Sequence, residues 1–347
     1  ERLTLEDALA LYEDNDLLFL ADCARRAKEK KSGRSVYYTV NRHINLTNIC
    51  SSNCPLCAFQ VEAGDARGFV MEPGDIERVL EQAKKTPNLS EIHIVSALHP
   101  DKPFSYYRAV VRQVKAALPH VDVKAFTPVE IVNFAKMTGK SIREVLSLLK
   151  EDGLDSLPGG GAEILSDRVR AIICPKKATT DEWIETMKAA HSLGIRTNAS
   201  IMYGHVETIE ERLQHLITIR EIQDETGGFQ TFICFPFLPK HTELGKEVKQ
   251  TSMWDDLCTM AISRLMLDNF KNIKAYWVML TVPVAQVALS FGANDIDGTV
   301  HKETILHDAG AQSPTALSED NIIRIIKEAG RTPAACDCNF NILRIIE

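Results

Sequence analysis

The chain has 347 residues, of which 45% are hydrophobic and 25% are charged, and this composition excludes a disordered or fibrous protein. The longest apolar runs, such as Phe232–Leu238 and Ala275–Leu280, are far shorter than the roughly 18 to 20 residues of a membrane helix, so no membrane partner is expected. Asp and Glu outnumber Lys and Arg by 47 to 40, for a formal charge of −7, and no basic cluster interleaves with aromatic residues. Nucleic acid is therefore not an expected partner.

The cysteines indicate a reducing compartment. There are nine of them, an odd number, and three fall within eight residues. This distribution is typical of thiols that bind a metal or cluster inside a cell, and not of a disulfide framework. The segment Glu1–Asp7 is acidic and amphipathic, unlike a secretory signal. A cytoplasmic protein is expected.

Short β-branched runs alternate along the chain with stretches of helical periodicity. A helical stretch at about 4–30 comes first. Eight predicted strands follow, at Tyr38–Asn45, Glu91–Ser96, Val121–Thr127, Gly153–Leu157, Arg196–Tyr203, Phe229–Phe235, Ile273–Met279 and Val287–Asn294. The helical patterns lie at about 74–86, 103–118, 128–151, 179–193, 207–224, 253–269 and 318–329, with a short one at Val284–Ala288 after strand seven.

Eight strands that are each followed by a helix predict an α/β fold, a (β/α)8 TIM-type barrel, with an open doubly wound sheet as the alternative. Residues 1–35 are expected to form a helical N-terminal extension, and residues 36–347 the barrel with a C-terminal tail. In such a barrel the chemistry belongs at the C-terminal ends of the strands.

Three cysteines follow the first predicted strand in the pattern Cys50-x3-Cys54-x2-Cys57. Three thiolates on one short loop can hold one metal centre. Structural zinc normally takes a fourth protein ligand, and no Cys or His pair at a suitable spacing is evident. A [4Fe–4S] cluster usually has four thiolates, so three leave one iron free to bind another molecule. The spacing favours such a cluster in the loop after strand one.

The loop resembles that of the radical S-adenosylmethionine (SAM) enzymes, with Leu56 in the hydrophobic position before the third cysteine. The resemblance extends from about residue 38 to about residue 330. Segments similar to the futalosine-pathway enzymes and their deazaflavin-synthase relatives are His43–Cys50, Cys57–Phe59, Leu98–Asp101, Pro158–Ile164 and Gln223–Phe229. Two further segments, Tyr276–Leu280 and Phe291–Thr299, most resemble the aminofutalosine synthases of menaquinone biosynthesis.

This resemblance implies that the three cysteines bind three irons and that SAM chelates the fourth through its amino and carboxylate groups. It implies a transferase that adds the 5′-deoxyadenosyl radical to 3-[(1-carboxyvinyl)oxy]benzoate and gives 6-amino-6-deoxyfutalosine. The implied partners are this aryl enol-ether dicarboxylate and a reducing electron donor such as flavodoxin or ferredoxin. The sister dehypoxanthine futalosine cyclase and a deazaflavin-synthase-like enzyme stay open as alternatives.

SAM needs polar partners for its amino-acid and ribose groups and an apolar slot for adenine. Small residues after strand two match the place where relatives carry a small-residue motif, and Ser200–Glu207 resembles the family's G-x-I-x-G-x-x-E. The glycine run Gly159–Gly161 lacks a phosphate-binding context, so close backbone approach to a ligand is expected there. The expected SAM-binding residues are Leu56, Phe59, Ser96, Ala97, Glu163, Arg168, Met202, Gly204 and Glu207.

A substrate with two carboxylates and an aromatic ring needs cationic or donor groups beside apolar surface. Candidates at the strand ends are His43, Asn45, His99, Asn198, His241, Thr242, Trp277 and Asp297. A zinc or iron–sulfur protein without radical chemistry is the alternative from another class. The pair Cys336-x-Cys338 has no partners nearby in the sequence and is not expected to hold a second cluster.

Overall fold

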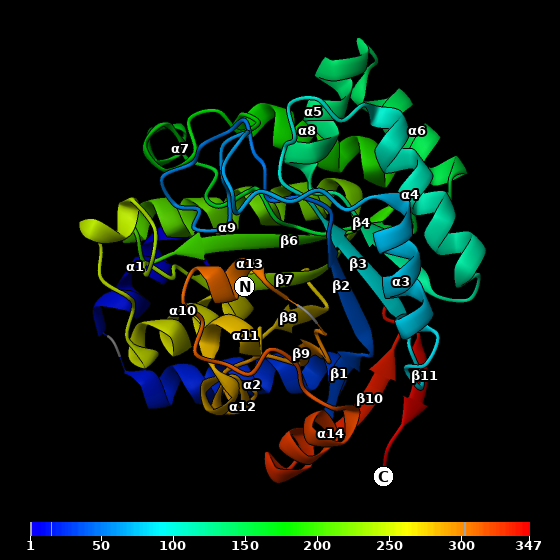
Figure 1. Ribbon diagram of the computed structural model, residues 1–347. Helices are drawn as coiled ribbons and strands as arrows, with labels where there is room; N and C mark the ends of the chain where they lie inside the picture. Colours follow the sequence, from blue (N-terminus) through cyan, green and yellow to red (C-terminus); the bar gives the residue numbers. More distant parts are fainter. Residues whose placement is uncertain (1, 15, 302) are drawn as a thin grey trace.

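The computed structural model describes residues 2–14, 16–301 and 303–347, and its centre is a curled sheet of parallel strands (Figure 1). Seven strands follow one another in chain order: β3 (Glu91–Val95), β4 (Asp122–Ala125), β5 (Ser156–Leu157), β6 (Arg196–Tyr203), β7 (Phe229–Pro236), β8 (Asn272–Lys274) and β9 (Asp295–Gly298). Residues 35–45 join the two ends of this row, as β1 (Ser35–Thr39) and β2 (Asn41–Asn45). Since β2 pairs with β3 and β1 pairs with β9, the expected barrel is confirmed.

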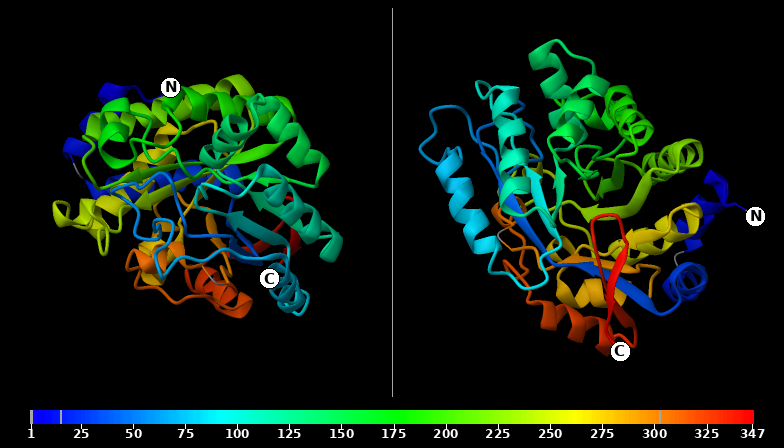
Figure 2. Two further views of the ribbon diagram at one scale, coloured as in Figure 1. Left: turned by 45° about the horizontal axis from the view of Figure 1, so that its top comes forward. Right: turned by 90° about the vertical axis from the view of Figure 1, so that its right-hand side faces the viewer.

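Most of the helices lie on the outside of the strands, whereas the short α13 lies in front of the strands in Figure 1 (Figures 1 and 2). These helices are α3 (Pro73–Ala83), α4 (Phe104–Ala117), α5 (Pro128–Thr138), α6 (Ile142–Glu151), α7 (Asp167–Ile173), α8 (Thr180–Ser192), α9 (Ile209–Thr226), α10 (Met253–Met266), α11 (Trp277–Leu280), α12 (Val282–Ala288), α13 (Ile305–Asp308) and α14 (Glu319–Glu328). Capping boxes of the Ser/Thr-x-x-Glu type begin four of them, at Thr127, Ser141, Thr179 and Thr208.

Both ends of the chain pack on the barrel. Helix α2 (Leu17–Ser32) contacts α10, and α1 (Leu5–Asp14) contacts α9. At the other end, β10 (Thr332–Cys336) pairs with β1, and β11 (Ile342–Ile345) completes a hairpin (Figure 2, right). The turn between them reaches the first residues of two strands, since the Cys338 amide donates to Asp122 and the Gln230 amide to Asn339. The hairpin therefore covers the end of the barrel opposite the functional loops.

Two predicted strands are placed differently in the structure. The predicted strand Val287–Asn294 is wrong: residues 282–288 are helical, and the eighth strand is Asp295–Gly298. Strand seven ends at Lys274, after which Trp277–Leu280 forms a helical turn. Short apolar runs fit both the helical and the strand period, and periodicity alone does not separate them. The predicted helix 128–151 is divided at Gly139, which has a left-handed φ of 66°.

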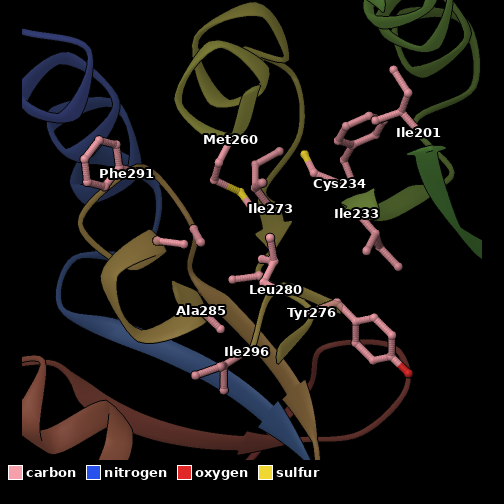
Figure 3. Packing of buried hydrophobic residues seen from close by; sticks show 14 of the residues in the cluster. Ile201, Ile233, Cys234, Met260, Ile273, Tyr276, Leu280, Ala285, Phe291 and Ile296 are labelled. Carbon is pink, nitrogen blue, oxygen red and sulfur yellow. The ribbon is translucent and has the colours of Figure 1, made fainter. Parts of the chain in front are cut away.

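The core fills the space between the strands and the outer helices. Figure 3 shows Met260 of α10 beside Ile273 of β8 and Cys234 of β7, and all three side chains are fully buried. Each Å² of apolar surface that is buried stabilises the fold by about 25 cal/mol. This packing holds the strands, and therefore the strand ends that carry the site, in place. Within the described residues, no helix has both the length and the hydropathy to cross a membrane.

Candidate active site

A cavity of about 290 Å³ lies at the C-terminal ends of the strands. It brings together residues that are far apart in the sequence, because parallel strands end at the same edge of a barrel. Twelve of the residues expected from the sequence line it: His43, Asn45, Cys50, Cys54, Cys57, Phe59, Ser96, Ala97, Glu163, Met202, Asn198 and Asp297. Cluster, SAM and substrate candidates therefore share one space.

The cysteine loop is held by backbone hydrogen bonds at both ends. The Cys50 amide donates to the Val61 carbonyl at 3.0 Å, and the Ser51 amide donates to the Leu98 carbonyl, in the loop after β3, at 2.9 Å. Asn53 takes a left-handed φ of 47°, a conformation that Asn tolerates, and this turn brings Cys54 and Cys57 back toward Cys50. The backbone thus presents three thiols to the cavity wall.

The donor set of this loop fits an iron–sulfur cluster. Burial raises the pKa of the Cys54 thiol to about 12, and the Lys177 ammonium opposes that shift. A thiol in this setting ionises when a metal takes the place of its proton. Among the described residues no three His, Cys, Asp or Glu side chains converge on a single metal ion. A [4Fe–4S] cluster instead binds each thiolate to its own iron, as three cysteines on one loop allow.

A buried ion pair stands beside the cysteines. The Lys177 ammonium lies 2.5 Å from a carboxylate oxygen of Glu163, and both side chains line the cavity. Burial opposes ionisation of Glu163, but the Lys177 charge holds the pKa of this carboxyl below its ordinary value. The Glu163 carbonyl accepts from the Met202 amide at 2.6 Å, which ties the pair to β6. Glu163 therefore offers a charged acceptor at a fixed place.

The glycine run before Glu163 serves close packing. A Cβ at Gly159 would come within 2.8 Å of backbone atoms of Asn198 and Ala199. The Ser200 hydroxyl also donates to the Gly159 carbonyl at 2.8 Å. Gly159 thus lets the loop after β5 lie against β6, where Asn198 and Met202 face the cavity.

Charged and polar side chains from five strands form the floor of the cavity. Lys274 of β8 bonds to Asp297 and lies 3.5 Å from Asp295, both of β9. On the opposite side, Lys124 of β4 lies 2.5 Å from Glu91 of β3. The other two members are His43 of β2 and His93 of β3, whose ring centroids are 4.6 Å apart. Burial lowers the pKa of both imidazoles, so both rings are neutral near pH 7.

Several polar atoms of the cavity wall lack a partner within the described part of the chain. They are His43 Nε2, Gln60 Oε1, Ser96 Oγ, Asn198 Oδ1 and Asp297 Oδ2, each buried. A buried polar atom without a hydrogen bond costs about 1–3 kcal/mol. Because these atoms all line one cavity, they indicate that a polar ligand bound there supplies the missing hydrogen bonds.

Four expected SAM residues lie outside this cavity. Arg168 is half exposed and pairs with Glu211 at 2.5 Å. Leu56 packs in an apolar cluster with Ile164 and other side chains. Glu207 accepts hydrogen bonds from the amide of Gly204 at 2.6 Å and of His205 at 2.9 Å, and from Arg212 at 2.8 Å. Burial opposes ionisation, yet the His205 imidazole, 2.8 Å from the carboxylate, and then Arg212 and the Gly204 amide lower the pKa of Glu207 to about 2. Glu207 and Gly204 therefore shape the turn after β6.

Four expected substrate residues also lie outside it. Trp277 is buried, and its indole N–H donates to the Gly298 carbonyl at 2.9 Å, as a core residue. His99 accepts through Nδ1 from the amides of Asp101 and Lys102. His241 bonds to the Asp308 carbonyl at 2.9 Å, and Thr242 donates to the Pro239 carbonyl at 2.8 Å; both belong to the loop after β7.

Sequence reasoning missed six titratable residues of the wall. They are His93, Lys124, Glu130, Lys177, Lys274 and Glu303. A usable signal was present for three of them, because His93, Lys124 and Lys274 each stand between apolar residues of a strand, as in Ile273-Lys274-Ala275. A charged residue inside an otherwise apolar strand of a barrel points to its interior.

The chain matches known proteins along its whole length. A model of the radical SAM superfamily matches residues 44–219, and a model of the CofH/MqnC C-terminal region matches residues 226–347. Aminodeoxyfutalosine synthase of Thermus thermophilus is 43% identical over 99% of this chain and 93% of that protein. The 5-amino-6-(D-ribitylamino)uracil–L-tyrosine 4-hydroxyphenyl transferase of Archaeoglobus fulgidus is 41% identical over 90% of each chain.

Solved structures agree with the fold. Methylornithine synthase has a TM-score of 0.73 at 17% identity, covering 96% of this chain and 95% of its own. The FeFe-hydrogenase maturase HydG of Carboxydothermus hydrogenoformans has a TM-score of 0.75 at 16% identity, covering 98% and 78%. With the three-cysteine loop at the mouth of a barrel and the family match over residues 44–219, the chain belongs to the radical SAM superfamily of enzymes, which use a [4Fe–4S] cluster and SAM.

Proposed function

We propose that this enzyme is an aminofutalosine synthase. It would join the 5′-deoxyadenosyl group of SAM to the enol-ether double bond of 3-[(1-carboxyvinyl)oxy]benzoate, move the aryl group and release a carboxyl group, giving 6-amino-6-deoxyfutalosine. The observation that carries the proposal is the position of Asp295–Thr299, a segment that resembles these synthases: it contains β9 and puts Asp297 in the cavity of the three cysteines. The 43% identity to the Thermus synthase supports the same reading.

Cys50, Cys54 and Cys57 would hold three irons of the cluster, and Glu163 and Ser96 would bind polar groups of SAM. When bound, the cluster and SAM supply the 5′-deoxyadenosyl radical. Phe59 and Met202 offer the apolar surface for adenine, since both line the cavity beside the cysteines. The chain thereby fixes the reactive carbon at one end of the cavity.

The other end suits an aromatic ring. Phe235 and Tyr276 form an edge-to-face pair with centroids 5.6 Å apart, and Met279, Ile305 and Leu306 add apolar surface. An aryl group buried there leaves water and contacts ring edges and faces. The apolar wall also excludes water from the reacting carbons.

A second candidate is the transfer of a 4-hydroxyphenyl group from tyrosine, because the Archaeoglobus transferase is nearly as similar to this chain as the Thermus synthase. Both reactions need the same cluster and SAM end of the cavity. The residues at the substrate end of the cavity therefore determine which of the two reactions occurs.

The fate of the adenosyl group tests the proposal. With SAM labelled in its ribose, a reductant and the enol ether at saturation, we expect a labelled aryl-ketone nucleoside, one methionine per product and little free 5′-deoxyadenosine. Mass spectrometry of the products measures all three. Stoichiometric 5′-deoxyadenosine with unlabelled product would contradict an adding enzyme. A product formed only from tyrosine and 5-amino-6-(D-ribitylamino)uracil would favour the second candidate.

Glu163 provides a prediction for SAM binding. In Glu163→Gln the shape is kept but the charged acceptor is lost, and Lys177 loses its partner. A charge-assisted hydrogen bond is worth about 1.5–3 kcal/mol, so we expect SAM affinity to fall roughly 10- to 100-fold while the brown chromophore is retained. Equilibrium binding of SAM to the reconstituted variant measures this. The exposed Glu185→Gln is the control, and unchanged affinity in Glu163→Gln would remove this residue from the SAM site.

A further inference from the structure

His43 combines three features that the SAM site does not use. It lines the floor of the cavity from β2. Its Nε2 atom is buried and has no hydrogen-bond partner in the ranges that the structure describes. Its ring lies against that of His93, with ring centroids 4.6 Å apart and ring planes tilted by 34°. The imidazole is therefore held in place, while its Nε2 atom is left without a hydrogen-bond partner.

The charges around this ring are mostly negative. The carboxylates of Asp297, Glu303 and Glu91 lie near enough to favour its protonated form, and the Lys274 ammonium opposes them. The neutral ring of His93 lies against it, and the Lys124 ammonium of β4 is paired with Glu91. Burial outweighs the carboxylates and lowers the pKa of His43, so the ring is neutral in the free protein.

The negative charge around His43 is unfavourable for the substrate of the proposed function. A dicarboxylate brings two more negative charges into a buried site where the carboxyl groups of Asp295 and Asp297 already share the Lys274 ammonium. A buried carboxylate without a positive partner is costly, and the usual response is a change of protonation. His43 is the neutral base of the floor whose free nitrogen faces the cavity.

Resting on the proposed function, we propose that His43 anchors one carboxylate of the aryl enol-ether dicarboxylate, and that its imidazole takes up a proton from solvent as that carboxylate binds. The resulting imidazolium donates from Nε2 to the carboxylate oxygen, a charge-assisted hydrogen bond. The proton comes from buffer, and no bond within the substrate changes. His43 is thus a determinant of specificity for an anionic group.

Linkage gives the sign of the pH dependence. A bound carboxylate raises the pKa of His43 above its value in the free protein. Affinity is therefore highest below the pKa of the free protein and falls as pH rises through the window up to the pKa of the complex, by at most about tenfold per pH unit. Asp297, whose pKa is already held below its ordinary value, stays ionised in that window.

Calorimetric titration of the enol ether into the SAM-bound holoenzyme, without a reductant so that no turnover occurs, tests this. Titrations at pH 7.5 in two buffers with different ionisation enthalpies give the number of protons taken up, and we expect roughly one. His43→Gln should abolish the uptake and weaken binding roughly 10- to 100-fold, with an affinity that no longer depends on pH. The exposed His120→Gln is the matched control and should behave like the parent protein.

A second arm does not depend on the folding of any variant. Two monomethyl esters of the substrate, each lacking one carboxylate charge, are titrated into the parent protein. We expect one of the two to bind without proton uptake. Uptake that persists in His43→Gln, or with both esters, would overturn the proposal and place the proton on another group such as Asp295. Binding of the enol ether without uptake contradicts this inference alone, whereas no binding at all contradicts the proposed function as well.

Discussion

Replacement of Cys50, Cys54 or Cys57 by Ala is expected to abolish SAM cleavage. Each of these thiols lines the cavity from one loop, and three irons need three thiolates. Two thiolates hold only two of the irons, so the four-iron cluster with one iron open to SAM is lost. The measurement is 5′-deoxyadenosine plus adenosyl product per enzyme after anaerobic reconstitution and reduction, with iron content determined on the same samples. We expect background levels for all three variants.

Cys336→Ala and Cys338→Ala serve as controls. Both residues are buried at the opposite end of the barrel, in β10 and in the turn after it, so removing a thiol there costs packing but no ligand. Cleavage close to that of the parent protein is expected. Full cleavage by Cys54→Ala without an intact cluster would contradict the role of the loop, and loss of the cluster in Cys338→Ala would show that a ligand lies elsewhere.

Local sequence features predicted the cysteine loop and the barrel. The three cysteines fall within eight residues, so their proximity needs no tertiary contact, and the alternation of strands and helices is a repeated signal. His43 and Asn198 were expected from their place on predicted strands, because parallel strands of a barrel bring their ends to one edge, and Met202 from the resemblance of Ser200–Glu207 to a family motif.

Pairing between distant side chains was not predictable from the sequence. Arg168 was expected at a carboxylate of SAM, but the structure turns it to Glu211 on α9, while Lys177 takes the place beside Glu163. Both outcomes depend on how the short helix α7 sits on the barrel, which no periodicity describes. Likewise, Asp297 was expected at the site, but its Lys274 partner follows from the register of β8 with β9, where Lys274 stands opposite Asp295.

Lys274→Met is expected to destabilise the protein by about 3–5 kcal/mol, since breaking a buried ion pair from one side leaves uncompensated charge. Lys274 is buried between the carboxylates of Asp295 and Asp297. Met fills a similar volume, so the lost charge and not a cavity dominates the effect. Chemical denaturation at pH 7.5 measures the free energy of unfolding. The exposed Lys271→Met is the matched control and should stay within about 0.5 kcal/mol of the parent.

The pH dependence of the Lys274→Met loss separates charge from packing. In the parent protein burial opposes ionisation of Asp297, but Lys274 keeps the pKa of this carboxyl below its ordinary value, so its stabilising contribution is present above the unfolded pKa and is lost as pH falls through the folded pKa. Without the ammonium, burial raises the pKa of Asp295 and Asp297 above the unfolded value. The folded variant then binds protons that the unfolded chain releases, so its loss of stability relative to the parent protein should shrink as pH falls from 8 to 5.

The double variant Lys274→Met/Asp297→Asn should recover part of the stability at pH 8. A deficit that is the same at both pH values and is not relieved in the double variant would assign the effect to packing of the lysine stem.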